Sequence, residues 1–459
     1  MKETTIVAIA TPLGAGGVSI VRLSGKDSLA IASQLFVCRT PMDKIVPRMM
    51  YLGNLTTKDF TEQCLMVYFK APYSFTGEDV VEFQCHGGRL ITQGIVEACL
   101  DHGAILAQGG EFSKRAFVNG KLSLDQAEGI MDMISAQSQS EIRAGYQLLS
   151  GKLQQSILSM QNHLTNLLAR MEVTMDYPEE DIEEETVDIV ETELMQVSNE
   201  MQQLLATKHT GKLVRDGVKV AIVGRPNAGK SSLMNALLQY ERAIVTDIQG
   251  TTRDIIEESY LYQGVRFTLV DTAGIRESSD TIEKIGIEKS WATLDYADIL
   301  LMVIDGSSPL TEEDKTILES IKGKEYFVVI NKQDLAQKVD KTTIAQCLGI
   351  KLEDLEKVCI TISAQSGKVD AIKQRLYDAQ NMKDYEGQGV VLTNLRHIES
   401  LTLALQSITK ALESLKMGNT LDLVAIDIKE CWLHLGDVTG NSQNESIITE
   451  IFEKFCVGK

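Results

Sequence analysis

Residues 224–231 read GRPNAGKS, and they stand between an apolar run, VKVAIVG, and an amphipathic segment, SLMNALLQY. The two glycines let backbone N–H groups turn inward toward phosphate oxygens, and a helix that begins here adds the positive end of its dipole. The lysine can reach the β- and γ-phosphates, and the serine hydroxyl can ligate Mg²⁺. The segment therefore predicts a phosphate-binding loop, because an accidental glycine turn would not need both flanking elements.

Three further motifs follow in order, each at the end of an apolar run. DTAG (271–274) ends VRFTLVD, NKQD (331–334) ends EYFVVI, and SAQ (363–365) follows VCITI. Asp334 can accept two hydrogen bonds from N1–H and the exocyclic amine of guanine, a pair that adenine cannot supply. Together the four motifs predict a module that binds GTP with Mg²⁺.

The segment VTDIQGTTRD (245–254), between the first two motifs, predicts a loop that closes over Mg²⁺ and the γ-phosphate. Thr251 and Thr252 are its candidate ligands, and simple turn residues are the alternative. The residues expected to bind GTP are Asn227, Ala228, Gly229, Lys230, Ser231, Ser232, Thr246, Asp247, Ile248, Gln249, Gly250, Thr251, Thr252, Asp271, Thr272, Ala273, Gly274, Asn331, Lys332, Asp334, Ser363, Ala364 and Gln365.

Hydrolysis needs a group that orients the attacking water, and Ras-like enzymes use a glutamine directly after the DxxG glycine. Here that residue is Ile275, whose aliphatic side chain cannot orient water. A partner's arginine, a nearby carboxylate or a metal cation could replace the glutamine. The side-chain oxygen of Asn227, with carbonyls of the 246–252 loop, could hold a monovalent cation near the β/γ bridge. The alternative is that Asn227 is only a turn residue that tolerates a left-handed backbone.

The composition is that of a multidomain globular protein. The chain has 459 residues, of which 44% are apolar and 24% charged. A net charge of −19 argues against a broad electrostatic footprint for nucleic acid, although a local basic patch is compatible with it. The eight cysteines form no CxxC pair, and no apolar run is long enough to span a membrane. We expect a cytoplasmic protein without a membrane anchor.

The positions of the apolar residues predict a multidomain α/β plus all-α protein with four segments. Residues 1–120 indicate an α+β domain, and residues 216–378 alternate strands and helices as a mostly parallel, doubly wound sheet requires. Residues 121–215 and 379–459 carry helical stripes that need a partner for their apolar faces. We expect one helical domain into which the α/β module is inserted; two separate helical domains are the alternative.

Along essentially its whole length the chain resembles the tRNA modification GTPases of the MnmE (TrmE) family. The resemblance rests on TIVAIATPLGAGGVSIVRLSG, SFTGEDVVEFQCHGG, GEFSKRAFVNGKLSLDQAE, GRPNAGKSSLMNAL, DIQGTTRD, DTAGIRE, NKQD and the terminal CVGK. It implies a folate-binding-like N-terminal domain, similar to the aminomethyltransferase of glycine cleavage, that dimerises the chain. It also implies a Ras-like GTPase domain inserted into a discontinuous helical domain.

The resemblance further implies a GTP hydrolase coupled to tRNA uridine modification. The homodimer would act with an FAD- and NADH-using partner, MnmG (GidA), in a heterotetramer on tRNA. The pair would add an aminomethyl or carboxymethylaminomethyl group to C5 of the wobble uridine. The one-carbon unit would come from a tetrahydrofolate derivative, in its 5-formyl or 5,10-methylene form.

The residue roles that the resemblance implies fall into four groups. They are potassium ligands at Asn227, Thr246, Ile248 and Thr251; Mg²⁺ ligands at Ser231 and Thr252; a catalytic carboxylate at Glu283; and folate-binding residues at Arg22, Glu82, Lys121 and Lys459. A ribosome-assembly or translation GTPase would share the nucleotide-binding motifs, and a scaffold without useful turnover is a third possibility. The N-terminal motifs and the terminal CVGK distinguish a tRNA modification GTPase from a ribosome-assembly or translation GTPase.

The last four residues, CVGK, place Cys456 fourth from the end, as in a prenylation signal. Gly458 and Lys459 fit that signal poorly, and no second membrane signal accompanies it. A frayed tail is the second possibility. The third, which the resemblance favours, is that the helix ESIITEIFEKF delivers Cys456 to the folate site, where its thiol acts in catalysis.

Overall fold

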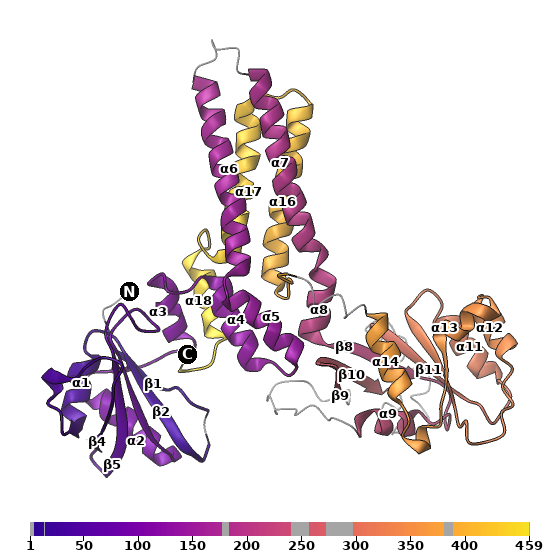
Figure 1. Ribbon diagram of the computed structural model, residues 1–459, viewed down its shortest axis with the longest axis horizontal. Coiled ribbons are helices and arrows are strands. Elements are labelled where there is room, and N and C mark those ends of the chain that lie inside the picture. Colours follow the sequence, from indigo (N-terminus) through magenta and orange to yellow (C-terminus); the bar gives the residue numbers. More distant parts are fainter. Residues whose placement is uncertain are drawn as a thin grey trace, which may run out of the picture. The chain divides into compact units, whose positions relative to one another are not determined.

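The computed structural model describes residues 4–12, 14–176, 183–239, 257–271, 297–380 and 389–458. The chain divides into two compact units (Figure 1). One comprises residues 1–131, 147–199 and 399–459, and the other comprises residues 132–146 and 200–398. The predicted fold class is confirmed: an α+β N-terminal part, helices from both sides of the inserted module, and an α/β P-loop module. The four-segment domain boundaries remain a prediction.

The N-terminal part is built on a seven-stranded sheet in the order β3-β4-β5-β6-β2-β1-β7. Its strands are β1 (Ile6–Ile9), β2 (Gly16–Ser24), β3 (Phe36–Cys38), β4 (Met50–Thr56), β5 (Thr61–Phe69), β6 (Val80–Gly87) and β7 (Ile105–Leu106). Only the β1–β7 pair is parallel. The apolar runs TIVAIA, GVSIVRL, LMVYF and VVEFQ coincide with β1, β2, β5 and β6, whereas β3, β4 and β7 were not predicted.

Two helices, α1 (Ser28–Leu35) and α2 (Arg89–Asp101), share a hydrophobic core with this sheet. The core takes alternate residues of the longer strands, such as Val81, Phe83 and Cys85 of β6. The residues between them, among them Glu82, therefore lie on the opposite face of the sheet. A third helix, α3 (Glu111–Val118), follows β7.

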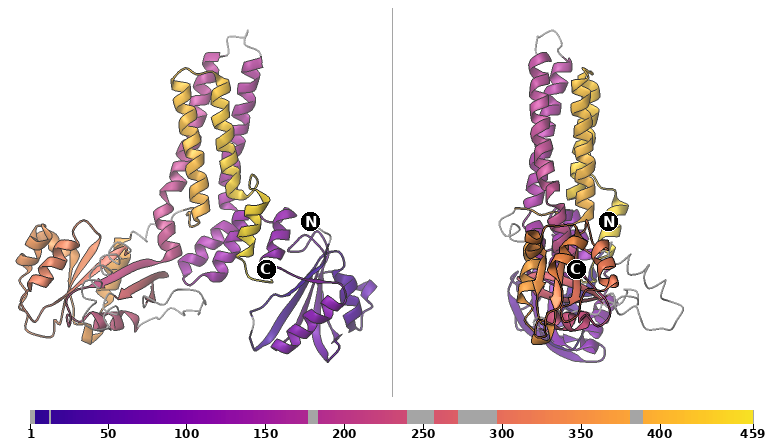
Figure 2. Two further views of the ribbon diagram at one scale, coloured as in Figure 1. Left: turned by 180° about the vertical axis from the view of Figure 1, so that it is seen from behind. Right: turned by 90° about the vertical axis from the view of Figure 1, so that its right-hand side faces the viewer.

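Four long helices lie side by side in Figures 1 and 2: α6 (Lys152–Asp176), α7 (Glu183–Ala206), α16 (Leu395–Lys416) and α17 (Leu421–Thr439). Gln161 of α6 donates a hydrogen bond to the Trp432 carbonyl of α17 (2.9 Å), and the Trp432 indole donates one to Thr165 (3.1 Å). Helices from before and after the inserted module thus share one bundle, which rules out two separate helical domains. The shorter helices are α4 (Leu124–Ser135), α5 (Gln139–Leu149), α8 (Lys208–Asp216) and α18 (Glu445–Glu453), of which α8 and most of α5 belong to the unit that contains the inserted module.

The predicted apolar stripes are buried with local exceptions. In α16, Leu401 and Ile408 are fully buried as expected, but Leu405 and Leu412 are only half-buried. Ala404 and Ala411 are fully buried instead, because they lie at helical spacing from Leu401 and Ile408. In α18 the predicted stripe includes Ile447, whose side chain is exposed.

The inserted module has a six-stranded sheet in the order β13-β12-β11-β8-β10-β9. Its strands are β8 (Val218–Val223), β9 (Glu257–Tyr262), β10 (Val265–Asp271), β11 (Ile299–Asp305), β12 (Tyr326–Asn331) and β13 (Cys359–Thr361). The helices are α9 (Lys230–Leu238), α11 (Glu312–Ser320), α12 (Lys341–Leu348), α13 (Leu352–Val358) and α14 (Asp370–Ala379). All strands except β9 run parallel, so the carboxyl ends of β8, β10, β11 and β12 meet at one edge.

Candidate functional site

The phosphate-binding loop connects β8 to α9 and is closely packed against neighbouring strands. Gly224 has φ +143°, and a Cβ there would lie 2.3 Å from the Val303 carbonyl oxygen. Gly229 has φ +96°, and a Cβ there would lie 2.1 Å from Nδ2 of Asn331. Both positions therefore require glycine for two reasons, the left-handed backbone and the lack of space for a side chain.

The lysine of this loop folds back over it. Nζ of Lys230 donates to the carbonyl oxygens of Gly224 (2.8 Å) and Arg225 (2.9 Å). Ser231, the next residue in the first turn of α9, is exposed. A hydroxyl beside a lysine at a helix N-terminus suits an Mg²⁺ ion that also takes oxygens from a triphosphate.

Asn331, the last residue of β12, ties three motifs together. Its Nδ2 donates to the Ala228 carbonyl oxygen (3.0 Å), and its Oδ1 accepts from the backbone N–H groups of Lys332 (2.8 Å) and Ala364 (2.9 Å). Asn331 is buried. The P-loop, NKQD and SAQ therefore converge at one edge of the sheet through a single amide.

The other NKQD residues face the same edge. Lys332 has φ +62°, and its Nζ donates to the carbonyl oxygen of Asn227 (3.1 Å). Asp334 accepts a hydrogen bond from the Ser363 side chain, which lowers the pKa of the Asp334 carboxyl. A carboxylate held ionised in this way is a good acceptor for the N1–H and amine of guanine.

Asn227 adopts the left-handed conformation that its interpretation as a turn residue requires, with φ +60°. Its side chain is exposed. This conformation is compatible with the predicted cation site, which stays a prediction.

Several predicted site residues lie outside the described residues. They are Thr246, Asp247, Ile248, Gln249, Gly250, Thr251, Thr252, Thr272, Ala273, Gly274, Glu283 and Lys459. Asp271 ends β10, and its backbone is paired with Ile222 of β8, two residues before the first glycine of the P-loop. The roles assigned to these residues stay predictions.

In the N-terminal part, the structure brings two predicted folate-binding residues together. Arg22 and Glu82 are register partners on β2 and β6, and Nε of Arg22 donates to Glu82 Oε1 (2.8 Å). The guanidinium also lies 5.8 Å from the ring centroid of Phe75 and 5.6 Å from that of Phe112. Since the ion pair uses Nε, the Nη groups are the donors that a folate carboxylate would meet.

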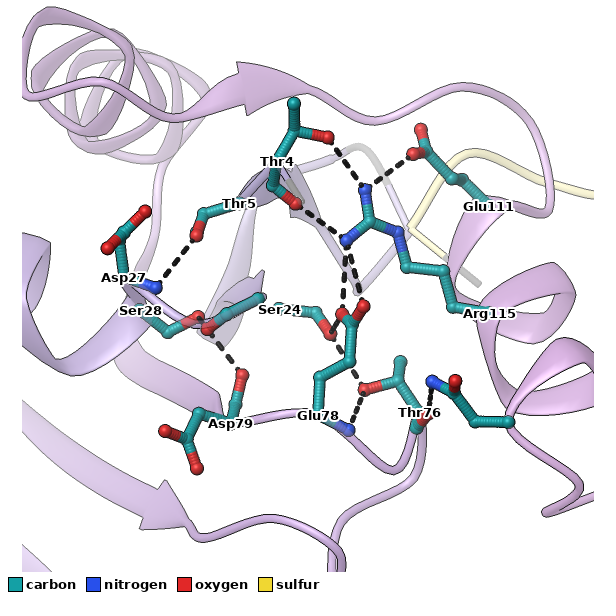
Figure 3. A network of polar contacts seen from close by, with 12 residues as sticks. Thr4, Thr5, Ser24, Asp27, Ser28, Thr76, Glu78, Asp79, Glu111 and Arg115 are labelled. Atoms are coloured by element: carbon teal, nitrogen blue, oxygen red, sulfur yellow. Dashed lines mark hydrogen bonds and ion pairs between the residues drawn. The ribbon is translucent and has the colours of Figure 1, made fainter. Parts of the chain in front are cut away.

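A buried polar network holds the segments that carry these two rings (Figure 3). Arg115 of α3 pairs with Glu78 (3.0 Å) and Glu111 (2.9 Å), and it donates to the Thr4 carbonyl oxygen (2.7 Å). Ser24 Oγ donates to the same Glu78 carboxylate (2.7 Å). The network fixes α3 and the 74–79 loop to the sheet, and so it fixes both sides of the Arg22 site.

Lys121 follows α3, and its backbone N–H donates to the Ala116 carbonyl oxygen (2.8 Å). Its Cε lies 3.3 Å from the point where a Cβ of Gly77 would stand. Lys121 therefore borders the same 74–79 loop that carries Phe75, although the lysine and Arg22 come from different elements.

The C-terminal tail is docked, so the frayed-tail alternative is wrong for the described residues 455–458. Val457 forms an antiparallel bridge with Gly109, and the Gly110 N–H donates to the Cys456 carbonyl oxygen (3.3 Å). Gly458 has φ +96°, and a Cβ there would lie 2.2 Å from the Ile9 carbonyl oxygen. Cys456 is exposed. The tail lies against the end of β1 and the residues that precede Phe112.

The sequence interpretation missed three charged residues at the nucleotide edge. Arg225 of the P-loop lies near Asp305 (3.7 Å) and Asp314 (3.4 Å), and Lys332 pairs with Asp305 (2.7 Å). Asp305 ends the apolar run ILLMVID. The criterion that singled out Asp271 and Asn331, a polar residue at a strand's carboxyl end, would have found it.

A P-loop module in which NKQD and SAQ meet the phosphate-binding loop defines a guanine-nucleotide-binding protein. The family model described as "MnmE helical domain" matches residues 124–456, and that described as "GTP-binding protein TrmE N-terminus" matches residues 5–121. The chain belongs to the MnmE family of tRNA modification GTPases, a family of GTP hydrolases.

Curated relatives agree with this assignment over the full length. The tRNA modification GTPase MnmE of Alkaliphilus metalliredigens is 38% identical, covering 100% of this chain and 99% of that protein. The protein of the same name from Enterococcus faecalis is 39% identical with the same coverage. Among solved structures, the G domain of the T. maritima FeoB iron transporter is 25% identical, with a TM-score of 0.26, over 35% of this chain and 97% of that chain. In the part of the chain that the structure describes, no helix is both long and apolar enough to cross a membrane.

Proposed function

We propose that this chain is a K⁺-stimulated GTPase that acts in tRNA modification. With an FAD-dependent partner of the MnmG (GidA) type, its homodimer adds an aminomethyl or carboxymethylaminomethyl group to C5 of the wobble uridine of certain tRNAs. The one-carbon unit comes from a tetrahydrofolate derivative bound in the N-terminal part. The reaction takes place in the cytoplasm.

The observation that carries the GTPase half of the proposal is the set of hydrogen bonds made by Asn331. Through Ala228 and Ala364, this amide joins the P-loop to both base-recognition segments. A nucleotide whose phosphates lie on Gly229 and Lys230 would place its base beside Asp334. Mg²⁺ fits beside Ser231 as a hard cation with oxygen ligands, and it would neutralise charge on the transferred phosphoryl group.

The Arg22 site supports the folate half. A guanidinium beside two aromatic rings suits a flat ligand that ends in carboxylates. Glu82 accepts from Nε of this guanidinium and so holds its Nη groups in a fixed orientation toward such a ligand. The docked tail brings Cys456 to the same part of the molecule, because Gly110 and Phe112 are close neighbours in sequence.

Deleting the chain from its host is expected to leave the wobble uridines of the substrate tRNAs without the C5 group. Mass spectrometry of nucleosides from purified tRNA measures this directly. A wild-type copy on a plasmid should restore the modification. A Glu283→Ala copy should not restore it, because we propose that this carboxylate activates the water that attacks GTP. Glu319→Ala, an exposed carboxylate on α11, is the matched control and should restore it.

Normal modification in cells that lack the chain would refute the proposal. It would then favour the other candidate, a ribosome-assembly or translation GTPase. Restoration by Glu283→Ala would separate tRNA modification from GTP hydrolysis.

GTP turnover is expected to be much faster in KCl than in NaCl at equal ionic strength. The cation would take the place of the missing glutamine, and a cage of Asn227 and loop carbonyls would discriminate by ionic radius. Asn227→Gly removes the side-chain oxygen and tolerates the observed φ of +60°, so it should abolish the preference without distorting the loop. Equal turnover of the wild-type protein in the two salts would refute the cation site.

A further inference from the structure

The carboxylate of Asp305 lies between the two loops that would hold a nucleotide. Asp305 is the last residue of β11, and its side chain is largely buried. Oδ2 accepts from Nζ of Lys332 (2.7 Å) and lies 3.7 Å from Nη2 of Arg225. One loop carries the guanine-reading motif and the other carries the phosphate-binding motif, so a single carboxylate faces a cation from each.

Asp305 is itself held rigidly. Its Oδ1 accepts hydrogen bonds from the backbone N–H (3.0 Å) and hydroxyl (2.6 Å) of Ser307. Burial would raise the pKa of the Asp305 carboxyl, but the hydrogen bonds from Lys332 and Ser307 outweigh burial and lower that pKa. The group is therefore a fixed anion at neutral pH.

Arg225 extends the same network to a helix. Its guanidinium contacts Ser308, and its Nε lies 3.4 Å from Oδ2 of Asp314, a fully buried residue. Asp314 also closes the capping box of α11, accepting from the Thr311 N–H (3.1 Å) and hydroxyl (2.8 Å). Arg225 of the P-loop thus faces two carboxylates, Asp305 at the end of β11 and Asp314 in the first turn of α11.

The backbone at the contact point requires such support. Lys332 and Asn227 both have positive φ, +62° and +60°, which is costly for residues other than glycine. They touch each other through Nζ of Lys332 and the Asn227 carbonyl oxygen (3.1 Å). Ordering a flexible lysine side chain costs rotamer entropy, and the second contact of its ammonium, to Asp305, offsets part of that cost.

We propose that Asp305 is a positioning residue for guanine-nucleotide binding, which fixes Lys332 and Arg225 so that the base-reading and phosphate-binding loops keep one spacing. The proposal rests on the proposed GTPase function of this site. In this role Asp305 touches neither the base nor the phosphates. Its main effect passes through Lys332, because that contact is the shorter of the two.

The test compares GDP affinity and GTP turnover of the wild-type protein and Asp305→Asn, in KCl and MgCl₂. The dissociation constant for GDP and the KM for GTP are expected to rise about tenfold, roughly the loss of one charge-assisted hydrogen bond, with kcat within about twofold. Partial unfolding would instead lower kcat and leave KM unchanged. Asp354→Asn, which removes an exposed pair with Lys357 on α13, is the matched control and should change neither constant.

Two further variants separate positioning from other roles. If Asp305 acts mainly through Lys332, the double variant with Lys332→Ala should lose clearly less GDP affinity than the sum of the two single losses. Ser307→Ala, which removes one hydrogen bond to Asp305, should raise the GDP dissociation constant by a smaller factor and serves if Asp305→Asn does not fold.

The outcomes are distinguishable. A wild-type protein that fails to bind GDP overturns the proposed function and this proposal with it. A wild-type protein that binds GDP, with Asp305→Asn and Ser307→Ala binding equally well, overturns the positioning role alone. Additive losses in the double variant also overturn it.

Discussion

Asp334→Asn is expected to lower the affinity for GTP by roughly a hundredfold or more and to make xanthosine triphosphate the better ligand. The carboxylate would accept two hydrogen bonds from guanine, each charge-assisted, and an amide replaces one acceptor by a donor. Xanthine offers a carbonyl where guanine has its amine, so it matches the amide. Isothermal titration calorimetry gives the dissociation constants for GTP and xanthosine triphosphate, and their ratio shows which base is preferred.

The control for this variant is Asp340→Asn. Asp340 is the N-cap of α12, where its side chain accepts from the Thr342 N–H, and asparagine caps helices equally well. This second Asp→Asn change should leave both affinities as they are. An unaltered preference for guanine in Asp334→Asn would show that NKQD does not read the base.

Cys456→Ser is expected to reduce wobble-uridine modification by roughly a hundredfold or more while GTP hydrolysis stays near the wild-type rate. The loss has the size expected when a nucleophile or general acid is removed. The substitution changes an exposed sulfur and leaves the backbone bonds of the tail intact. Cys347→Ser, on α12, is the matched thiol control and should affect neither activity.

Gly458→Ala tests the placement of the tail separately from the thiol. A Cβ at this position would meet the Ile9 carbonyl oxygen at 2.2 Å, and the φ of +96° disfavours any side chain, so the tail must move. Modification should fall with Cys456 still present, because a displaced reactive group loses its geometry. Loss in Gly458→Ala but not in Cys456→Ser would make the tail a positioning element without thiol chemistry.

Much of the nucleotide site was predictable because its chemistry is local. Gly229, Lys230 and Ser231 are adjacent in sequence, and the apolar runs VKVAIVG and EYFVVI reveal buried parallel strands without knowledge of their neighbours. Polar residues at the ends of such strands, as at Asn331, could therefore be assigned to one edge of a sheet before the structure was known.

The strands β3, β4, β7 and β9 escaped prediction, and the physical reason is clearest for β4 and β9. β4, MYLGNLT, has apolar residues at the exposed positions Met50 and Leu52 and a glycine in its interior. Its sequence therefore does not alternate between apolar and polar residues. Glycine is required at position 53 because a Cβ there would lie 2.4 Å from the Val37 carbonyl oxygen and 2.5 Å from the Phe36 ring, both on the neighbouring strand. β9, EESYLY, is an antiparallel edge strand rich in carboxylates, which strand propensity disfavours.

The sequence alone determined the family, the nucleotide motifs and the class of each segment, since these depend on residue types at short spacing. Only the tertiary structure decided which distant charges meet. Arg22 and Glu82 pair because β2 lies beside β6 in that register, and Asp305 contacts Lys332 because β11 lies beside β12. Neither pair of strands is joined by a tight turn that would fix its register, so packing of the core across the sheet has to set it.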